Sequence, residues 1–550
     1  MRHALKVLLG LGLALGAAGC SDFLSGPGIA STSDPNNILS LKKPGPLYVA
    51  IQQAGPPQRQ GQLARIASEN TQQIAGVNRQ QQQSFDRYGA KPADTDTYFA
   101  AVYGSSNVVT GGGGLLDIHK LQQIARTAND SLFIGIAKVY EAMYIGFAAD
   151  FWGDIPYREA ADSTKRTPHF DPQLQVYADM QRQLDSAINV FLPTTGATNL
   201  GPTLDGVELT YVDRGTSRAA LRTVYAKVAH SLKARYYMHV AAASVAGVTG
   251  APPAAYDSAL AEAQLGIATT ADDFIWFADA STSGNNIWWQ FNSAREGDIE
   301  PGAALVEIMK RQIAGGFDDN QRLAFYFETA DGAAPDLLGA NFFGFRPGAT
   351  VVPTNGTIYN GSGDATGSYS IYGAFIDPNF TDGSFRQPEL TFAEMQLIAA
   401  EATWHINCPA CGDSTVVAGA QPFLDAARAS RQYGATSFGS APGVLPASLE
   451  NIIEEKYIAL FLNPEVWNDF KRTCLPRLAP APPVNSSIPG TSPIAGRVPY
   501  GQTEINANPN VPTTSSVGVT ITGTSRNPNQ PASCPVLNYT TPASNGKLAN

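Results

Sequence analysis

The stretch TFAEMQLIAAEATWH, residues 391–405, decides the fold class. Thr391 and Glu394 form a capping box, a pattern in which two side chains satisfy the free amides at the start of a helix. Apolar residues then recur every three or four positions, which is typical of a helix with one buried face. The Ala-rich stretch 416–433 follows, and small residues recur where the two helices would cross: Ala399, Ala400, Ala402, Ala426 and Ala427. The sequence therefore predicts a closely packed pair of helices.

The same helical period occurs in four other stretches, at residues 171–192, 217–243, 254–268 and 447–462. We expect Asp171 to cap the first of these helices, with Pro172 at its first position, and Ser448 to cap the last. Successive helices of this kind resemble the stacked helix pairs of tetratricopeptide repeats, although the strict consensus of about 34 residues is missing. We therefore expect a mainly α protein built from tetratricopeptide-like helix pairs.

A long segment at about residues 270–387 interrupts the predicted helices and is rich in Gly, Asn, Asp and Thr. Strand-like runs within it are short, as at residues 350–352 and 369–372, so we expect little β structure. A second irregular segment, rich in Pro, occupies about residues 480–550. Because long irregular insertions in compact proteins usually carry function, we expect the ligand region at about 270–387.

The first twenty residues have the pattern of an export signal. A cationic start precedes an apolar run at residues 7–15, which suits a signal peptide and is too short to span a bilayer. Small residues then lead to Cys20, an arrangement that resembles the bacterial lipobox with Ala17 in the place of its usual Leu. We expect a lipoprotein signal peptide at residues 1–19 and lipidation of Cys20. An ordinary signal peptide cleaved near Ala18 is the alternative.

The predicted mature chain consists of a tether and one large body. Residues 20–40 are rich in Ser, Gly, Pro, Asp and Asn, which is typical of a flexible linker, and the folded body is expected at residues 41–550. No later stretch reaches the length of apolar sequence that a transmembrane helix needs. The net charge of −10 and the lack of a basic run argue against nucleic acid as a partner.

If Cys20 carries lipid, four cysteines remain: Cys408, Cys411, Cys474 and Cys534. An even number in an exported protein suggests disulfides. Cys408 with Cys411 would close a small loop and Cys474 with Cys534 would hold the C-terminal tail, but three pairings are possible. The pair at 408 and 411 also resembles half a zinc site, yet no second CxxC or HxxxH motif occurs, so we expect no metal site.

Seven segments, in order along the chain, resemble those of the SusD/RagB family of nutrient-binding outer-membrane lipoproteins. They are residues 21–24, 140–157, 319–327, 389–402, 424–431, 453–472 and 497–506. In the second segment, Trp152 replaces the usual Tyr before the turn Gly153-Asp-Ile-Pro156. In the third, Asn320-Gln321 replaces the usual Pro.

The resemblance implies a fold and a task. The fold would be a right-handed superhelical scaffold of tetratricopeptide-like helix pairs with large loop-rich insertions, which makes residues 41–550 one SusD-like α-helical nutrient-binding domain. The task would be to bind an oligosaccharide or peptide at the cell surface and deliver it to a SusC-like TonB-dependent β-barrel transporter in the outer membrane. Such a role needs no cofactor and no catalytic group.

Aromatic rings and amides in the loop-rich region are the candidate ligand contacts, because ring faces stack on sugars and amides bond to hydroxyls. The main candidates are Trp276, Trp288, Trp289, Phe291 and Asn286, with Tyr98 upstream. Phe99, Asn285, Gln290 and Asn292 lie beside them in the sequence. The alternative for each ring is a place in the hydrophobic core, where most large aromatic residues are found.

Two other classes of protein compete with nutrient capture. A surface hydrolase is disfavoured, because no GxSxG elbow, HExxH helix or P-loop occurs. Carboxylates such as Asp469, Glu401 and Glu465 leave a catalytic pair open, although carboxylates on helix faces are usually solvated or paired. A helical-repeat scaffold lipoprotein of the cell envelope is the second alternative, and it would bind a protein and no soluble glycan or peptide.

Overall fold

The computed structural model describes residues 44–104, 112–162, 164–192, 207–281, 284–295, 297–313, 316–317, 320–328, 342, 344–345, 347, 351–354, 357–360, 371–372, 383–433, 436–438, 443–478 and 494–512. The predicted signal peptide, the tether and Cys20 lie outside these residues. So does most of the predicted C-terminal tail, including Cys534.

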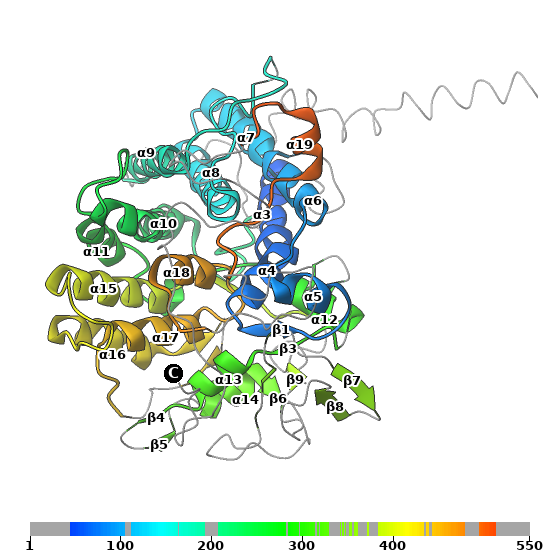
Figure 1. The fold of residues 1–550 in the computed structure, drawn as a ribbon. Helices are drawn as coiled ribbons and strands as arrows, with labels where there is room; N and C mark the ends of the chain where they lie inside the picture. Colours follow the sequence, from blue (N-terminus) through cyan, green and yellow to red (C-terminus); the bar gives the residue numbers. More distant parts are fainter. Residues whose placement is uncertain are drawn as a thin grey trace, which may run out of the picture.

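An array of packed helices forms one side of the molecule (Figure 1). Neighbours along the array contact each other in the order α7, α8, α9, α10, α11, α15, with α16 and α17 both against α15. Their bounds are Leu115–Thr127 for α7, Ser131–Trp152 for α8, Gln173–Phe191 for α9, Leu221–Val245 for α10, Ala255–Leu265 for α11, Phe392–Asn407 for α15, Gln421–Ser430 for α16 and Leu449–Ala459 for α17. This arrangement confirms the expected mainly α fold of tetratricopeptide-like helix pairs.

Helix starts agree with the sequence where the cap is local. Thr391 Oγ1 accepts a hydrogen bond from the backbone N–H of Glu394 at 3.1 Å, and Ser448 caps α17 in the same way. The prediction that Asp171 caps α9 was wrong. The N–H of Gln173 donates instead to Asp154 Oδ1 at 2.8 Å, and Asp171 accepts from the N–H groups of two residues in the turn after α8, Tyr157 and Arg158.

Helices from the beginning and the end of the described chain complete the molecule: α3, α4, α5, α6 and α19 lie on the opposite side of Figure 1, and α18 lies between α4 and the array. Their bounds are Gly45–Gln60 for α3, Gln62–Asn70 for α4, Arg79–Gln83 for α5, Pro92–Tyr103 for α6, Glu465–Thr473 for α18 and Gln502–Ala507 for α19. Helix α3 packs on α7, α6 on α8 and α19, and α4 on α18. Segments about 400 residues apart in the sequence therefore lie side by side here.

The described part of residues 270–387 contains three α-helices, one short 3-10 helix (Thr270–Asp272) and short strands. The α-helices are α12 (Ile287–Ala294), α13 (Ala303–Met309) and α14 (Asn320–Tyr326). The strands of the molecule form two-stranded antiparallel pairs: β1 (Ile74–Gly76) with β3 (Ile299–Pro301), β2 (Phe274–Ile275) with β10 (Pro388–Leu390), β4 (Gln312–Ile313) with β5 (Gly316–Phe317), β6 (Phe327–Glu328) with β9 (Ile371–Tyr372), β7 (Val351–Thr354) with β8 (Thr357–Asn360), and β11 (Gln432–Tyr433) with β12 (Thr436–Ser437). The expectation of little β structure is confirmed.

These elements have a hydrophobic core of their own. It joins Trp288, Leu305 and Tyr326 of the 270–387 segment to Phe461, just after α17. The rings of Tyr326 and Phe461 stack with centroids 4.3 Å apart. The described part of this segment is therefore a second packed layer, which lies below the helical array in Figure 1. It contains packed helices and strands as well as irregular backbone.

Helix α8 is the central helix of the main core. Among the described residues, it is the one helix long and apolar enough to cross a bilayer, but 89% of its most apolar window is buried inside the protein. Its acidic residues Glu141 and Asp150 are buried as well, and each carboxylate accepts at least one hydrogen bond from a side chain outside α8. Its hydrophobicity is therefore explained by burial in the folded body.

Gly146 of α8 provides a test of this packing. A Cβ at this position would overlap Tyr236 Oη on α10, and that hydroxyl is held in place because it donates to the carbonyl oxygen of Ala142 at 2.7 Å. We expect Gly146→Ala to lower the free energy of unfolding by about 1–3 kcal/mol in urea titrations, although alanine favours helix formation. The control is Gly412→Ala, where an added Cβ meets no atom within 4 Å. Equal stability of the two variants would contradict the prediction.

Cys408 and Cys411 form a disulfide just after α15, with Cα atoms 5.3 Å apart. This confirms the small loop that the sequence suggested. Cys474 is also disulfide-bonded. Because Cys534 lies outside the described residues, its pairing with Cys474 stays a prediction.

Candidate functional site

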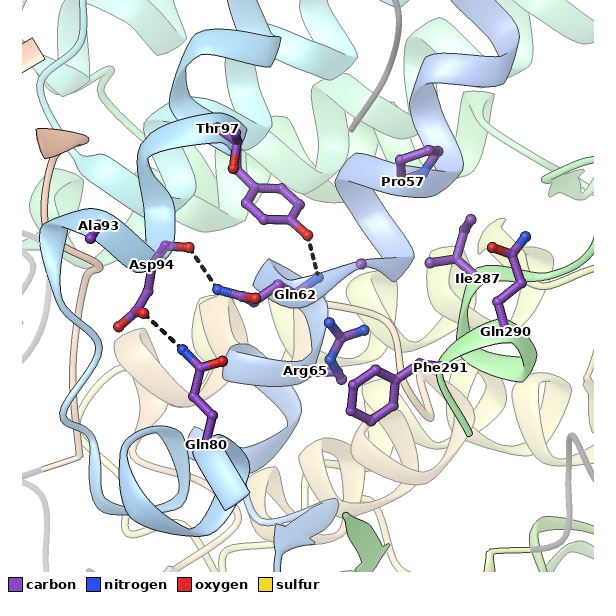
Figure 2. Close-up of a pocket in the computed structure, with 12 residues that line it drawn as sticks. Pro57, Gln62, Arg65, Gln80, Ala93, Asp94, Thr97, Ile287, Gln290 and Phe291 are labelled. Atoms are coloured by element: carbon purple, nitrogen blue, oxygen red, sulfur yellow. Dashed lines mark hydrogen bonds between the residues drawn. The ribbon is translucent and has the colours of Figure 1, made fainter. Parts of the chain in front are cut away.

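An open cleft of about 640 Å³ lies where α3, α4, α5, α6 and α12 meet (Figure 2). Polar side chains and two aromatic rings line it together. The lining residues are Pro57, Gly61, Gln62, Arg65, Gln80, Ala93, Asp94, Thr97, Tyr98, Ile287, Gln290 and Phe291. The N-terminal helices thus contribute most of the surface, and the loop-rich segment contributes one helix.

The junction between α3 and α4 sets one wall of the cleft. Gly61 lies between the two helices. A larger residue does not fit there, because its Cβ would overlap the carbonyl oxygen of Pro57. Just after it, the backbone N–H of Gln62 donates to Tyr98 Oη at 3.3 Å, and the Gln62 side-chain amide donates to the carbonyl oxygen of Asp94 at 2.6 Å (Figure 2). These bonds hold the start of α4 against α6 and fix the half-buried ring of Tyr98 at the cleft.

The carboxylate of Asp94 belongs to the start of α6. One of its oxygens accepts from the backbone N–H of Lys91 at 2.8 Å, which caps the helix. The other accepts from the Gln80 side chain of α5, also at 2.8 Å (Figure 2). Both oxygens therefore have partners, and Asp94 serves mainly to join α5 to α6.

Helix α12 forms the opposite wall. Asn286 is its N-cap: its Oδ1 accepts from the N–H groups of Trp288 and Trp289 at 2.9 and 3.2 Å, and its Nδ2 donates to the carbonyl oxygen of Phe385 at 3.1 Å. The helical period then sends Trp288 into the second core and leaves Ile287, Gln290 and Phe291 on the cleft side.

Arg65 of α4 lies at the floor of the cleft beside Phe291. The centre of its guanidinium lies 3.9 Å from the centroid of the Phe291 ring, which is a close cation–π contact. The residue is 8% exposed, and no described residue forms a hydrogen bond or an ion pair with its side chain. Burial lowers the pKa of this guanidinium from its ordinary value, although nearby acidic groups oppose the shift.

The structure brings two of the predicted site residues together, Tyr98 and Phe291, with their predicted neighbour Gln290. Trp289 is half-buried and packs against the second core. Trp276 and Trp288 are core residues, with 2% and 0% of their surface exposed.

For Trp276 and Trp288, the structure therefore shows the core alternative, and their rings are not available to a ligand. Trp276 packs against Gly55 of α3, and its Nε1 donates to Glu389 at 2.9 Å. The side chain of Asn286 also has partners within the protein. Its oxygen caps α12, and its nitrogen donates to the carbonyl oxygen of Phe385. Phe99 is also buried, with its ring against Trp152.

Sequence reasoning missed the polar half of the cleft. Gln62, Arg65, Gln80 and Asp94 come from α4, α5 and α6, about 200 residues before α12, and no pattern in the sequence marked them as neighbours of the loop-rich segment. One signal was available. Pro92 followed by Asp94 is typical of a helix start, and it would have predicted α6, the helix that includes Tyr98.

The carboxylates considered for catalysis are buried and paired. Glu401 and Asp469 both contact Arg472, and Asp469 Oδ1 also lies 2.8 Å from Lys456 Nζ. Glu465 contacts His239, whose other ring nitrogen lies 2.8 Å from Asp150. These last three residues lie close enough to share a metal ion. Because each ring nitrogen of His239 already faces a carboxylate, a protonated imidazole explains the group.

The fold and the cleft define a class of protein: a scaffold of helix pairs that presents an open, partly aromatic cleft between its N-terminal helices and an inserted layer. A family model described as "Starch-binding associating with outer membrane", SusD-like, matches residues 42–500. The chain belongs to this SusD-like family. The resemblance seen in seven sequence segments is thereby confirmed.

Solved structures share the fold. A chitin-binding protein aligns with a TM-score of 0.61 at 18% identity over 84% of this chain and 94% of its own. A SusD homologue from Bacteroides vulgatus aligns with a TM-score of 0.59 at 17% identity over 86% and 94%. A chitin-binding SusD homologue from Flavobacterium johnsoniae aligns with a TM-score of 0.53 at 19% identity over 84% and 92%. No curated protein sequence matches this chain significantly.

Proposed function

We propose that this protein captures a glycan at the outer membrane and passes it to a transporter. The observation that carries the proposal is the open cleft in which the half-buried rings of Tyr98 and Phe291 lie among the amides of Gln62, Gln80 and Gln290. Aromatic faces stack on the C–H faces of sugar rings, and amides bond to hydroxyls in either direction. An open cleft also admits one stretch of a long chain.

A glycan is a better match than a peptide for two reasons. The cleft has amides from three different elements, which suit a ligand with hydroxyls on all sides. The family description names starch, and two of the structurally similar proteins are chitin-binding. We propose no catalytic step, because the carboxylates considered for catalysis, Glu401, Glu465 and Asp469, are paired in the core, and both oxygens of Asp94 accept hydrogen bonds that join α5 to α6.

Attachment and delivery complete the proposal. Cys20 would carry the lipid that holds the protein on the membrane, and a SusC-like TonB-dependent barrel would accept the glycan. Family membership and the lipobox-like sequence support both steps. Extraction of the native protein in mild detergent is expected to bring a β-barrel protein with it. Repeated isolation without any barrel would favour the envelope scaffold.

The cleft is tested by calorimetry of the mature chain against neutral oligosaccharides, including fragments of starch and chitin. We expect Tyr98→Ala or Phe291→Ala to weaken binding up to about tenfold, because each variant loses an aromatic face whose stacking on a sugar is worth about 0.5–1.5 kcal/mol. Tyr237→Ala is the matched control, since this tyrosine is also half-buried but lies on α10, away from the cleft. Unchanged affinity in both cleft variants would contradict the assignment of the site.

A further inference from the structure

Arg65 is a buried cation without a counter-ion among the described residues. Its side chain is more than nine-tenths buried, its Nε has no hydrogen-bond partner, and no described carboxylate lies within ion-pair distance of it. Burying a charge without a partner costs free energy, and buried arginines are normally paired. In the charged cluster of the main core, by contrast, Arg235 and Arg472 each contact at least two carboxylates.

The acidic groups nearest to Arg65 do not form an ion pair with it. Burial, reinforced by Asp86, raises the pKa of Glu69, one turn further along α4, well above its ordinary value, although Arg65 opposes the shift. Asp298 is 3.1 Å from Arg79, with which it pairs. Asp94 accepts from the N–H of Lys91 and from Gln80, and Figure 2 shows the bond to Gln80 at the other side of the cleft. No described carboxylate therefore forms an ion pair with Arg65.

The orientation of Arg65 leaves its hydrogen-bonding groups free. The centre of the guanidinium lies over the ring of Phe291, and Figure 2 shows the group between Phe291 and Gln62 at the floor of the cleft. The guanidinium presents a planar fork of donors, which matches the two oxygens of a carboxylate. The cation–π contact with Phe291 holds the guanidinium in place at the cleft.

We propose that the cleft takes a glycan that carries a carboxylate, such as a uronic acid, and that Arg65 binds this group through two hydrogen bonds. This inference rests on the proposed function and names the ligand class of the same cleft. A single carboxylate fits better than a densely charged polymer, because Asp94 lines the same cleft and the whole chain has a net charge of −10. Neighbouring sugars would stack on Tyr98 and bond to the glutamine amides.

The test compares acidic sugars with related neutral sugars. Calorimetry of the full mature chain in mild detergent would use trigalacturonate and its methyl ester, a xylo-oligosaccharide with and without one glucuronic acid, and neutral starch and chitin fragments. We expect at least one acid to bind about tenfold or more tightly than its neutral partner, and the preference to shrink as NaCl is raised. Arg65→Gln should abolish the preference, and Arg65→Lys should keep only part of it because lysine lacks the fork.

Two controls keep the result interpretable. Arg126→Gln removes an exposed arginine outside the cleft and should leave the preference intact. The thermal midpoint of Arg65→Gln should equal or exceed that of the parent, because an unpaired buried charge is lost.

Three outcomes would overturn the proposal in different ways. Neutral sugars that bind with no preference for acids would remove the carboxylate inference and leave glycan capture standing. A preference that survives in Arg65→Gln would assign the carboxylate to another cation. Absence of binding to every sugar tested would count against the proposed function as well as this extension of it.

Discussion

Replacing Arg235 with methionine is expected to lower the free energy of unfolding by about 3–5 kcal/mol, which is typical when one partner of a buried ion pair is removed. Arg235 is 2% exposed. Its guanidinium donates to both oxygens of Glu394, at 2.8 and 2.7 Å, and to Glu389 at 3.0 Å. Glu389 keeps its contact with Arg59, but Glu394 would be left as a buried carboxylate without its main cation.

The effect follows from what Arg235 joins. It lies on α10, Glu394 lies in the first turn of α15, and Glu389 lies on β10, so one side chain ties α10 to two consecutive elements much further along the chain. Urea titration of the parent, of Arg235→Met and of the double variant Arg235→Met/Glu394→Gln would measure it. The second change removes the stranded charge and should restore part of the loss. Arg126→Met, at an exposed position of α7, should change stability by less than about 0.5 kcal/mol. A loss below about 1 kcal/mol for Arg235→Met would contradict the prediction.

Local signals in the sequence predicted much of the helical array. Thr391 with Glu394, and Ser448, cap their helices as expected, because a cap and its helix are adjacent in the chain. The start of α9 was misassigned for the opposite reason. Its cap comes from Asp154, nineteen residues upstream, in the turn that follows α8. A side chain brought in by tertiary structure leaves no local pattern for sequence analysis to detect.

The same distinction between local signals and tertiary contacts explains which residues of the cleft could be predicted from the sequence. Residue type and loop position sufficed to nominate Tyr98, Phe291 and Gln290, which line one cleft. They could not separate Phe291 from Trp288, because the choice depends on the second core, to which Phe461 contributes from more than 150 residues away. Arg65 was missed altogether. Its importance lies in the partners that it lacks, and a missing partner is visible only after the fold has placed every neighbouring carboxylate.

The second large effect concerns pH. His239 on α10 is buried, with Nδ1 2.8 Å from Asp150 on α8 and Nε2 2.7 Å from Glu465 on α18. Burial alone would lower the pKa of this imidazole, but the two carboxylates outweigh it and raise the pKa from 6.5 to about 9. The folded protein therefore holds this proton more tightly than the unfolded chain does. The stabilisation is complete below about pH 6.5 and is lost as the pH rises through about 9, with a total of about 3 kcal/mol.

Other groups titrate in the same range, and they decide over which pH range the effect of His239 is best measured. Burial lowers the pKa of Lys471 to about 8, so this lysine adds a slope of the opposite sign above pH 8. Burial raises the pKa of Asp273 to about 8, which adds a slope of the same sign below pH 8. Tyr177 donates to Asp150 at 2.5 Å, and Arg235 lies 3.7 Å from Glu465, so both also face the cluster. A comparison with a variant that lacks only the imidazole separates His239 from the rest.

The comparison is between the parent and His239→Gln, with urea titrations at intervals from pH 6 to pH 8. We expect the parent to exceed the variant most at pH 6 and the difference to shrink steadily toward pH 8, because only the parent loses the proton held between Asp150 and Glu465. His169→Gln is the control. His169 also contacts a carboxylate, Glu159, but its side chain is 74% exposed, and solvent screens such a pair. A difference between parent and His239→Gln that stays constant with pH would show that the imidazole acts by packing alone.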